Sequence, residues 1–140
     1  MIRKSALKPG LTLIEMVVVL MIIGIFAAIA VPSYFKFVSI VQERKATSDL
    51  KMLSTSVKTY HLTMMRWPDK LENLVEAPAD ENLRRKWGKG GFLEGDELPI
   101  DPWDHSYEYE KVHGEAKPYK IWSYGSGGED APEEDWIYAK

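Results

Sequence analysis

The chain has 140 residues, no cysteine and a formal net charge of −3 at pH 7. Beyond an apolar N-terminal segment, its length suits one small domain with its own core and excludes two. The missing cysteines exclude disulfide bonds, and the lack of a basic patch argues against nucleic acid as a partner.

A short basic stretch precedes a long apolar run at the N-terminus. Residues 1–10 contain three basic side chains and no acid, and residues 11–31 contain one charge, Glu15. About 20 apolar residues cross a hydrocarbon core of about 30 Å, and basic residues ahead of such a run stay in the cytoplasm. The pattern therefore predicts a single membrane span, with the N-terminus cytoplasmic and the downstream chain across the membrane.

Glu15 is out of place in this run, because a carboxylate there costs about 2.5–3.5 kcal/mol on insertion scales. One simple interpretation is an ordinary anchor with its glutamate at the membrane interface. Another is a secretory signal peptide, which is cut beyond the apolar run after small residues such as those in 24–31. The length of the run and the carboxylate at its cytoplasmic end argue against a signal peptide.

Residues 8–15, KPGLTLIE, resemble the leader junction of type IV pilins and type II secretion pseudopilins. The resemblance implies that a prepilin peptidase cuts between Gly10 and Leu11 and methylates the new N-terminus of Leu11. Glu15 then becomes the fifth mature residue and Pro32 the twenty-second, where the family usually has proline. Leu11 departs from the family, in which phenylalanine or methionine is commoner.

Such a cut would leave a positive amine at Leu11 close to the carboxylate of Glu15 within the apolar segment. The amine of one subunit can pair with the carboxylate of the next, which neutralises two costly charges at once. Glu15 is therefore predicted to direct the assembly and register of a helical homopolymer, and the resemblance implies that Pro32 is an assembly residue as well.

Apolar residues continue beyond Pro32 at steps of mostly three or four, which indicates an amphipathic helix. One helix is expected from about residue 12 to about residue 62, membrane-embedded in its first half and packed on a domain in its second. Pro32 lacks an amide donor, so it predicts a kink or a locally melted turn.

The rest of the chain predicts an α+β fold, in which the long helix packs on a small antiparallel sheet beside a loop-rich variable region, 66–103. Alternating residues and turn signals mark the other elements. They are a short helix near 69–76, strands at 106–112 and 119–124 with a turn at 113–115, and a third short strand at 136–138 or 91–93.

The segments LPIDPW at 98–103 and YKIWSYG at 119–125 are similar to the major pseudopilin of type II secretion, and the match spans nearly the whole chain. Asp104 stands where this family usually has a turn glycine, and aspartate tolerates left-handed backbone better than most residues. The resemblance implies a leader at 1–10, a transmembrane and assembly segment at 11–35 and a periplasmic domain at 36–140.

It also implies a structural subunit of a pseudopilus that drives secretion across the outer membrane. The expected partners are further copies of the chain, prepilin peptidase, the inner-membrane secretion platform and minor pseudopilins. A type IV pilin, used in adhesion, motility or DNA uptake, is the alternative. An enzyme is not expected, because His61, His105 and His113 lack metal-ligand spacing and the chain has no cysteine nucleophile.

The C-terminal loop, residues 125–135, carries five carboxylates among glycines and a proline. Oxygen ligands of this kind suit Ca²⁺, and a solvated acidic loop is the simpler alternative. The family resemblance implies Ca²⁺ ligation by Glu134, Asp135 and the carbonyl of Tyr124. The family usually has an aspartate where this chain has Gly127, so Glu129 and Asp130 are candidate replacements.

Overall fold

The computed structural model describes residues 10–88, 90–112 and 117–140. The predicted turn at 113–115 and residues 1–9 of the predicted leader lie outside these residues. The chain divides into two compact units, one ending at Ser39 and the other comprising Ile40–Lys140.

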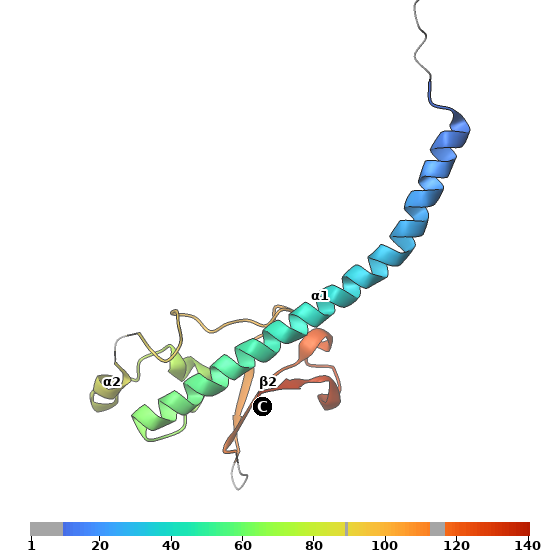
Figure 1. Ribbon diagram of the computed structural model, residues 1–140. Coiled ribbons are helices and arrows are strands. Elements are labelled where there is room, and N and C mark those ends of the chain that lie inside the picture. The colour runs from blue at the N-terminus through green and yellow to red at the C-terminus, as the bar shows by residue number, and fades with distance from the viewer. Residues whose placement is uncertain (1–9, 89, 113–116) are drawn as a thin grey trace, which may run out of the picture. The chain divides into compact units, whose positions relative to one another are not determined.

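Helix α1, Leu13–Met64, is continuous from the first unit into the second, which confirms the predicted long helix (Figure 1). It continues through Pro32, so the structure has no melted turn there. Beside Pro32, the Ser33 hydroxyl donates to the Ile29 carbonyl at 2.9 Å. This bond uses a main-chain oxygen one turn back, as serine commonly does within helices.

Within the first unit α1 is apolar on all sides. Leu13 is 83% exposed and Phe26 is 69% exposed, because this part of the chain offers nothing to cover them. By length and composition the helix can cross a membrane.

In the second unit α1 buries one face. Its buried apolar residues follow the spacing of an amphipathic helix and are Ala46, Leu50, Leu53, Val57, Tyr60 and Met64. All of these except Ala46 form one core with Leu71 and Leu74 of the 3₁₀ helix η1 (Leu71–Leu74) and with Tyr119 and Ile121. The short helix expected near 69–76 is thus a single 3₁₀ turn.

The sheet has three antiparallel strands in the order β1-β2-β3. They are β1 (Glu108–Lys111), β2 (Tyr119–Ser123) and β3 (Ile137–Tyr138). Strands β1 and β2 confirm the two predicted strands. Of the two positions predicted for a third strand, β3 lies at the C-terminal one, 136–138. Residues 91–93 form bends instead, because Gly91 has a φ of 68° and the Phe92 amide donates to the Leu74 carbonyl at 2.8 Å.

Three short helical elements were not predicted. Helix α2 (Glu81–Trp87) begins at Asp80, whose side chain accepts from the Asn82 and Leu83 amides. The other two are 3₁₀ turns in the C-terminal loop, η2 (Gly125–Gly127) and η3 (Glu133–Asp135). The loop is therefore ordered by its own backbone at both ends.

Candidate functional site

The predicted assembly residue Glu15 lies in the first turn of α1. Its Oε2 accepts from the amide and from the hydroxyl of Thr12, each at 2.8 Å, and its own amide donates to the Thr12 hydroxyl at 3.3 Å. This is a capping box, in which a threonine before the helix and a glutamate three residues later satisfy each other's free amides. Sequence reasoning missed this role of Thr12, although the pattern T-x-x-E signals it.

The surroundings of Glu15 are apolar and exposed. With Glu15, the side chains of Leu11, Ile14, Val18 and Val19 line a shallow hollow of about 360 Å³. The described part of the first unit provides no cation beside the carboxylate, since its only other charged side chain is Lys36, more than five helical turns away. A positive partner for Glu15 must therefore come from outside this described segment.

Of the predicted calcium ligands, two are brought together. Glu134 and Asp135 line one cavity of about 330 Å³ with Gly125 and Ser126, and Tyr124 directly precedes these glycine and serine residues. Residues of η3 and η2 thus line the same space, together with Glu43 of α1. Acidic side chains and main-chain oxygens are the kinds of ligand that Ca²⁺ takes.

The other candidate ligands are not part of this arrangement. Glu129 and Asp130 are exposed and do not line the cavity. Among the described residues, no group of three or more His, Cys, Asp or Glu side chains is arranged to hold a metal ion. Glu134 and Asp135 are therefore the only acidic residues of the loop 125–135 that line the cavity.

The position of the absent family aspartate is closed. A Cβ atom at Gly127 would lie 2.6 Å from the Cβ of Ala131. Real Cβ atoms do not approach so closely, so an aspartate at 127 would force Ala131 to move. The loop of this chain has therefore taken a conformation that depends on glycine at this point.

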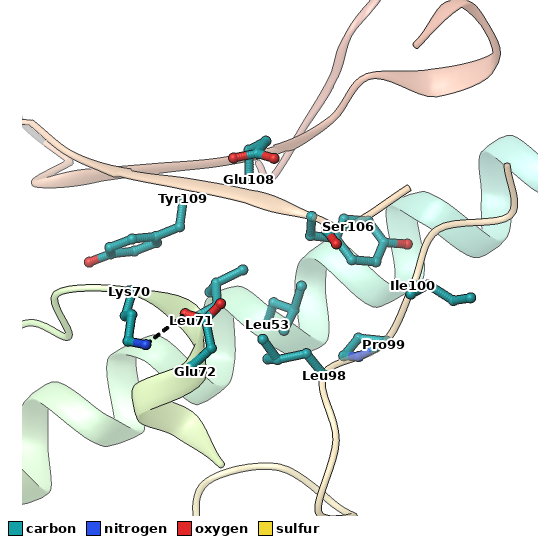
Figure 2. Close-up of a pocket in the computed structure, with 11 residues that line it drawn as sticks. Leu53, Lys70, Leu71, Glu72, Leu98, Pro99, Ile100, Ser106, Glu108 and Tyr109 are labelled. Atoms are coloured by element: carbon teal, nitrogen blue, oxygen red, sulfur yellow. Dashed lines mark ion pairs between the residues drawn. The ribbon is translucent and has the colours of Figure 1, made fainter. Parts of the chain in front are cut away.

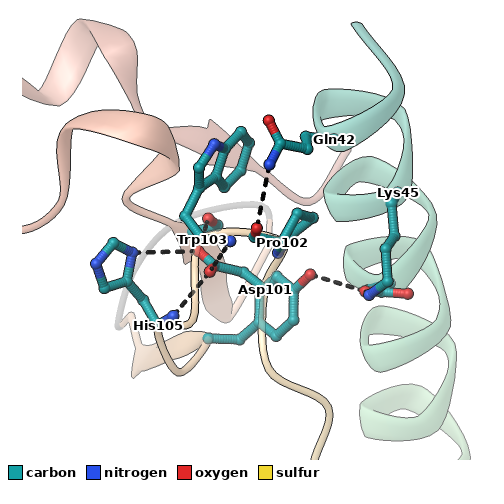
Figure 3. A network of polar contacts seen from close by, with 9 residues as sticks. Gln42, Lys45, Asp101, Pro102, Trp103 and His105 are labelled. Carbon is teal, nitrogen blue, oxygen red and sulfur yellow. Dashed lines mark hydrogen bonds and ion pairs between the residues drawn. The ribbon is translucent and has the colours of Figure 1, made fainter. Parts of the chain in front are cut away.

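A buried carboxylate holds the start of the same loop (Figure 3). The Asp101 side chain is fully buried and accepts from the Ser123 hydroxyl at 2.6 Å and from the amides of His105 and Trp103 at 2.8 and 3.0 Å. Ser123 in turn accepts from the Gly125 amide at 3.0 Å. One carboxylate thus connects the DPW turn to the end of β2 and the first residue of η2.

The turn beside Asp101 contains the second departure from the family pattern. Asp104 has a φ of 66°, the left-handed geometry for which the family uses glycine. The sequence-based expectation for Asp104 is therefore confirmed.

The two histidines that the structure describes, His61 and His105, form no catalytic arrangement. His105 Nδ1 lies 3.7 Å from the Asp101 carboxylate, but Ser123 bonds to that carboxylate directly and is itself buried. His61 stacks on Trp67 with ring centroids 3.9 Å apart. His113 lies outside the described residues.

Figure 2 shows a second cavity, of about 210 Å³, between α1, η1 and β1. Its lining is mixed polar and apolar and includes an ion pair between Lys70 and Glu72 at 3.9 Å. Leu53, Leu98 and Tyr109 contribute much of the wall.

A long exposed apolar helix that ends in a small packed sheet domain defines a pilin-like structural subunit. Residues 35–137 match the family model described as Type II secretion system (T2SS), protein G, and residues 8–31 match the prokaryotic N-terminal methylation motif.

Curated relatives agree with the family models. The chain is 34% identical over 136 residues to the type II secretion system core protein G of Escherichia coli K12, covering 95% of this chain and 92% of that protein. It is 32% identical over 126 residues to that of Pseudomonas aeruginosa, covering 88% and 87%.

A solved structure agrees as well. The crystal structure of the major pseudopilin from enterohaemorrhagic Escherichia coli superposes with a TM-score of 0.58 at 28% identity, covering 71% of this chain and 83% of that one. The chain belongs to the type II secretion protein G family and is a structural major pseudopilin, not an enzyme.

Proposed function

We propose that this pseudopilin is cut between Gly10 and Leu11 by prepilin peptidase, methylated at Leu11, and polymerised through Glu15. The subunit is anchored in the bacterial inner membrane with its second unit in the periplasm. The polymer is a periplasmic pseudopilus that works with the secretion platform and minor pseudopilins to drive protein secretion. The single observation that carries the proposal is an apolar, exposed helix with one carboxylate and no cation beside it in the described segment.

The capping box complicates the usual test of Glu15, because an alanine would remove both the charge and the helix cap. Two substitutions separate these roles. Glu15→Gln keeps a side chain that can complete the capping box and removes the charge. Thr12→Ala removes the cap at a cost of about 1 kcal/mol and keeps the charge.

The full chain is expressed with its secretion partners, and filaments are counted after shearing and by electron microscopy. Glu15→Gln should insert in the membrane and reach mature length, yet form no filaments. Thr12→Ala should still assemble. Normal filaments from Glu15→Gln would contradict the charge-pairing proposal.

Maturation is measured in the same samples by intact mass. Wild type should lose its first ten residues and gain a methyl group, whereas Gly10→Trp should keep them because a peptidase site beside the membrane has no room for the larger side chain. Mature-length protein from Gly10→Trp would refute the cleavage site.

We further propose that the C-terminal loop binds Ca²⁺ through Glu134, Asp135 and the Tyr124 carbonyl, with Glu129 and Asp130 as the remaining candidate ligands. The shared cavity of Glu134, Asp135 and the η2 backbone supports this proposal. When bound, Ca²⁺ would neutralise the two carboxylates and hold η3 against η2. Such a link has functional value in a chain without disulfides.

The test compares melting of the mature full-length chain in detergent, with millimolar CaCl₂ or with chelator. Calcium at a hundredfold excess over Kd adds about 2.7 kcal/mol, which raises the midpoint by roughly 10–20 °C for a domain near 100 residues. Glu134→Ala combined with Asp135→Ala should abolish the rise. A matched control, Glu94→Ala with Asp96→Ala, should preserve it, and equal melting of wild type in both buffers would refute the site.

A further inference from the structure

The face of the sheet that points away from the core carries aromatic and acidic side chains. In the described chain, no helix or strand covers this face. Along β2, Tyr119, Ile121 and Ser123 are buried, so the alternating Trp122 points to the other face. The strand register places Glu108 on one side of Trp122 and Tyr138 on the other.

Four aromatic rings gather on this outer face. The Trp122 and Trp136 rings are stacked with centroids 5.8 Å apart, and Tyr124 meets Trp136 edge-on at 5.0 Å. Tyr138 lies 6.0 Å from Trp122. All four are partly buried, so part of this aromatic cluster remains accessible to solvent.

Carboxylates surround these rings. Glu133 accepts from the Tyr138 hydroxyl at 2.7 Å. Partial burial, this bond and the nearby charges of Glu133 and Glu110 raise the pKa of Tyr138 to about 12. Burial, Glu108 and Glu129 likewise raise the pKa of Tyr124. The surface remains predominantly acidic even though Lys120 lies opposite Glu110 in the register.

Aromatic faces bordered by carboxylates attract cationic side chains, since a cation over a ring gains about 0.5–2 kcal/mol and the carboxylates add charge attraction. The chain itself supplies such a group. Residues 84–86, Arg-Arg-Lys on α2, are its only run of three consecutive basic residues, and all three are exposed. Arg84 donates to the Pro78 carbonyl and Arg85 pairs with Glu81 at 3.5 Å, so both contacts are local.

We propose that the outer aromatic and acidic face of one subunit binds the basic run 84–86 of a second copy in the filament. The two surfaces differ, so the contact is heterologous and continues from copy to copy, as a helical polymer requires. Arg85 contacts the carboxylates and the aromatic rings together. The inference rests on the proposed assembly into a pseudopilus.

The chain has no cysteine, so introduced thiols report on this contact alone. Arg85→Cys is placed in one tagged copy and Glu110→Cys in another, both full length, and the two are co-expressed with the secretion partners. A short bismaleimide should join them into a heterodimer in assembled filaments. Adding Glu15→Gln to both copies should abolish the product, since it blocks assembly.

Arg85→Cys with Asp96→Cys is the matched control, because Asp96 is an exposed acid outside the sheet. A second arm reverses charges: Arg85→Glu and Glu110→Arg should each reduce filament number, and their combination should restore it. Filaments without the 85–110 product, or with equal product from the control pair, would overturn the contact and leave the pseudopilus intact. Absence of filaments from wild type would instead overturn the proposed function.

Discussion

The buried Asp101 carboxylate should be among the most sensitive positions of the second unit. Replacing it by alanine removes three hydrogen bonds at 2.6–3.0 Å to its side-chain oxygens. The Ser123 hydroxyl is fully buried and cannot recruit water in its place, whereas the Trp103 and His105 amides lie in a partly buried turn. Unmet buried donors cost about 1–3 kcal/mol each, so we expect Asp101→Ala to cost about 3–4 kcal/mol.

For a unit of about 100 residues, that loss lowers the melting midpoint by roughly 12–30 °C. Asp101→Asn should cost less, because its remaining carbonyl oxygen still accepts from the turn. The midpoint is read from tryptophan fluorescence of the mature chain in detergent, with Asp96→Ala as the exposed control, expected within about 0.5 kcal/mol of wild type.

Asp101→Ala should also speed hydrogen exchange at residues 125–135, because Ser123 holds the Gly125 amide at the start of that loop. An Asp101→Ala melting midpoint equal to that of the Asp96→Ala control, or hydrogen exchange at residues 125–135 at the wild-type rate, would contradict this role of Asp101.

Two smaller perturbations test other parts of the same unit. Burial and a hydrogen bond to Asp49 at 2.9 Å raise the pKa of Tyr107. The neutral Tyr107 side chain therefore contributes fully to folding stability below the unfolded pKa of about 10, and this contribution declines as the pH rises above it. Tyr107→Phe should lower the free energy of unfolding by about 1 kcal/mol at pH 8 and should lose less stability than wild type between pH 8 and pH 11. Denaturant unfolding at the two pH values measures this, and an equal loss in both proteins would contradict it. Gly91→Ala should be destabilising by about 1–3 kcal/mol, because Gly91 has a φ of 68° and a Cβ there would lie 2.6 Å from the Leu74 carbonyl oxygen. Gly95 also has a positive φ but has open space around it, so Gly95→Ala is a control for the backbone strain without the steric contact. Equal melting of the two variants would contradict a steric clash between residue 91 and Leu74.

The elements that could be predicted from the sequence are those with many periodic residues. Helix α1 is apolar on all sides in the first unit and repeats its buried apolar spacing from Ala46 to Met64 in the second, and β2 alternates buried and partly buried side chains along its length. Helix α2 was missed because its seven residues carry only Leu83 and Trp87 toward the core. Its signal was in the cap: Asp80 precedes the helix and Gly88 follows it, which is the usual punctuation of a helix.

The candidate sites divide in the same way. The predicted leader junction around Gly10 and Glu15 is a motif of consecutive residues, so the sequence alone locates it. The Asp101 network joins residues 22 positions apart, and its partners depend on how the DPW turn closes over β2. Local patterns cannot reveal such a contact, although Asp104 hinted at the left-handed turn that makes it possible.

The C-terminal loop shows why a missing ligand cannot be judged from sequence alone. The family resemblance implies an aspartate where this chain has Gly127, and in the structure a Cβ at that position would lie 2.6 Å from the Ala131 Cβ. The Trp136 indole donates to the Ala131 carbonyl at 3.0 Å, and Tyr138 donates to Glu133. These contacts stabilise the loop without metal. Ca²⁺ bound at Glu134 and Asp135 would therefore strengthen an arrangement that the chain already makes. A loop with aspartate at 127, in contrast, would need Ala131 displaced before it could adopt this conformation.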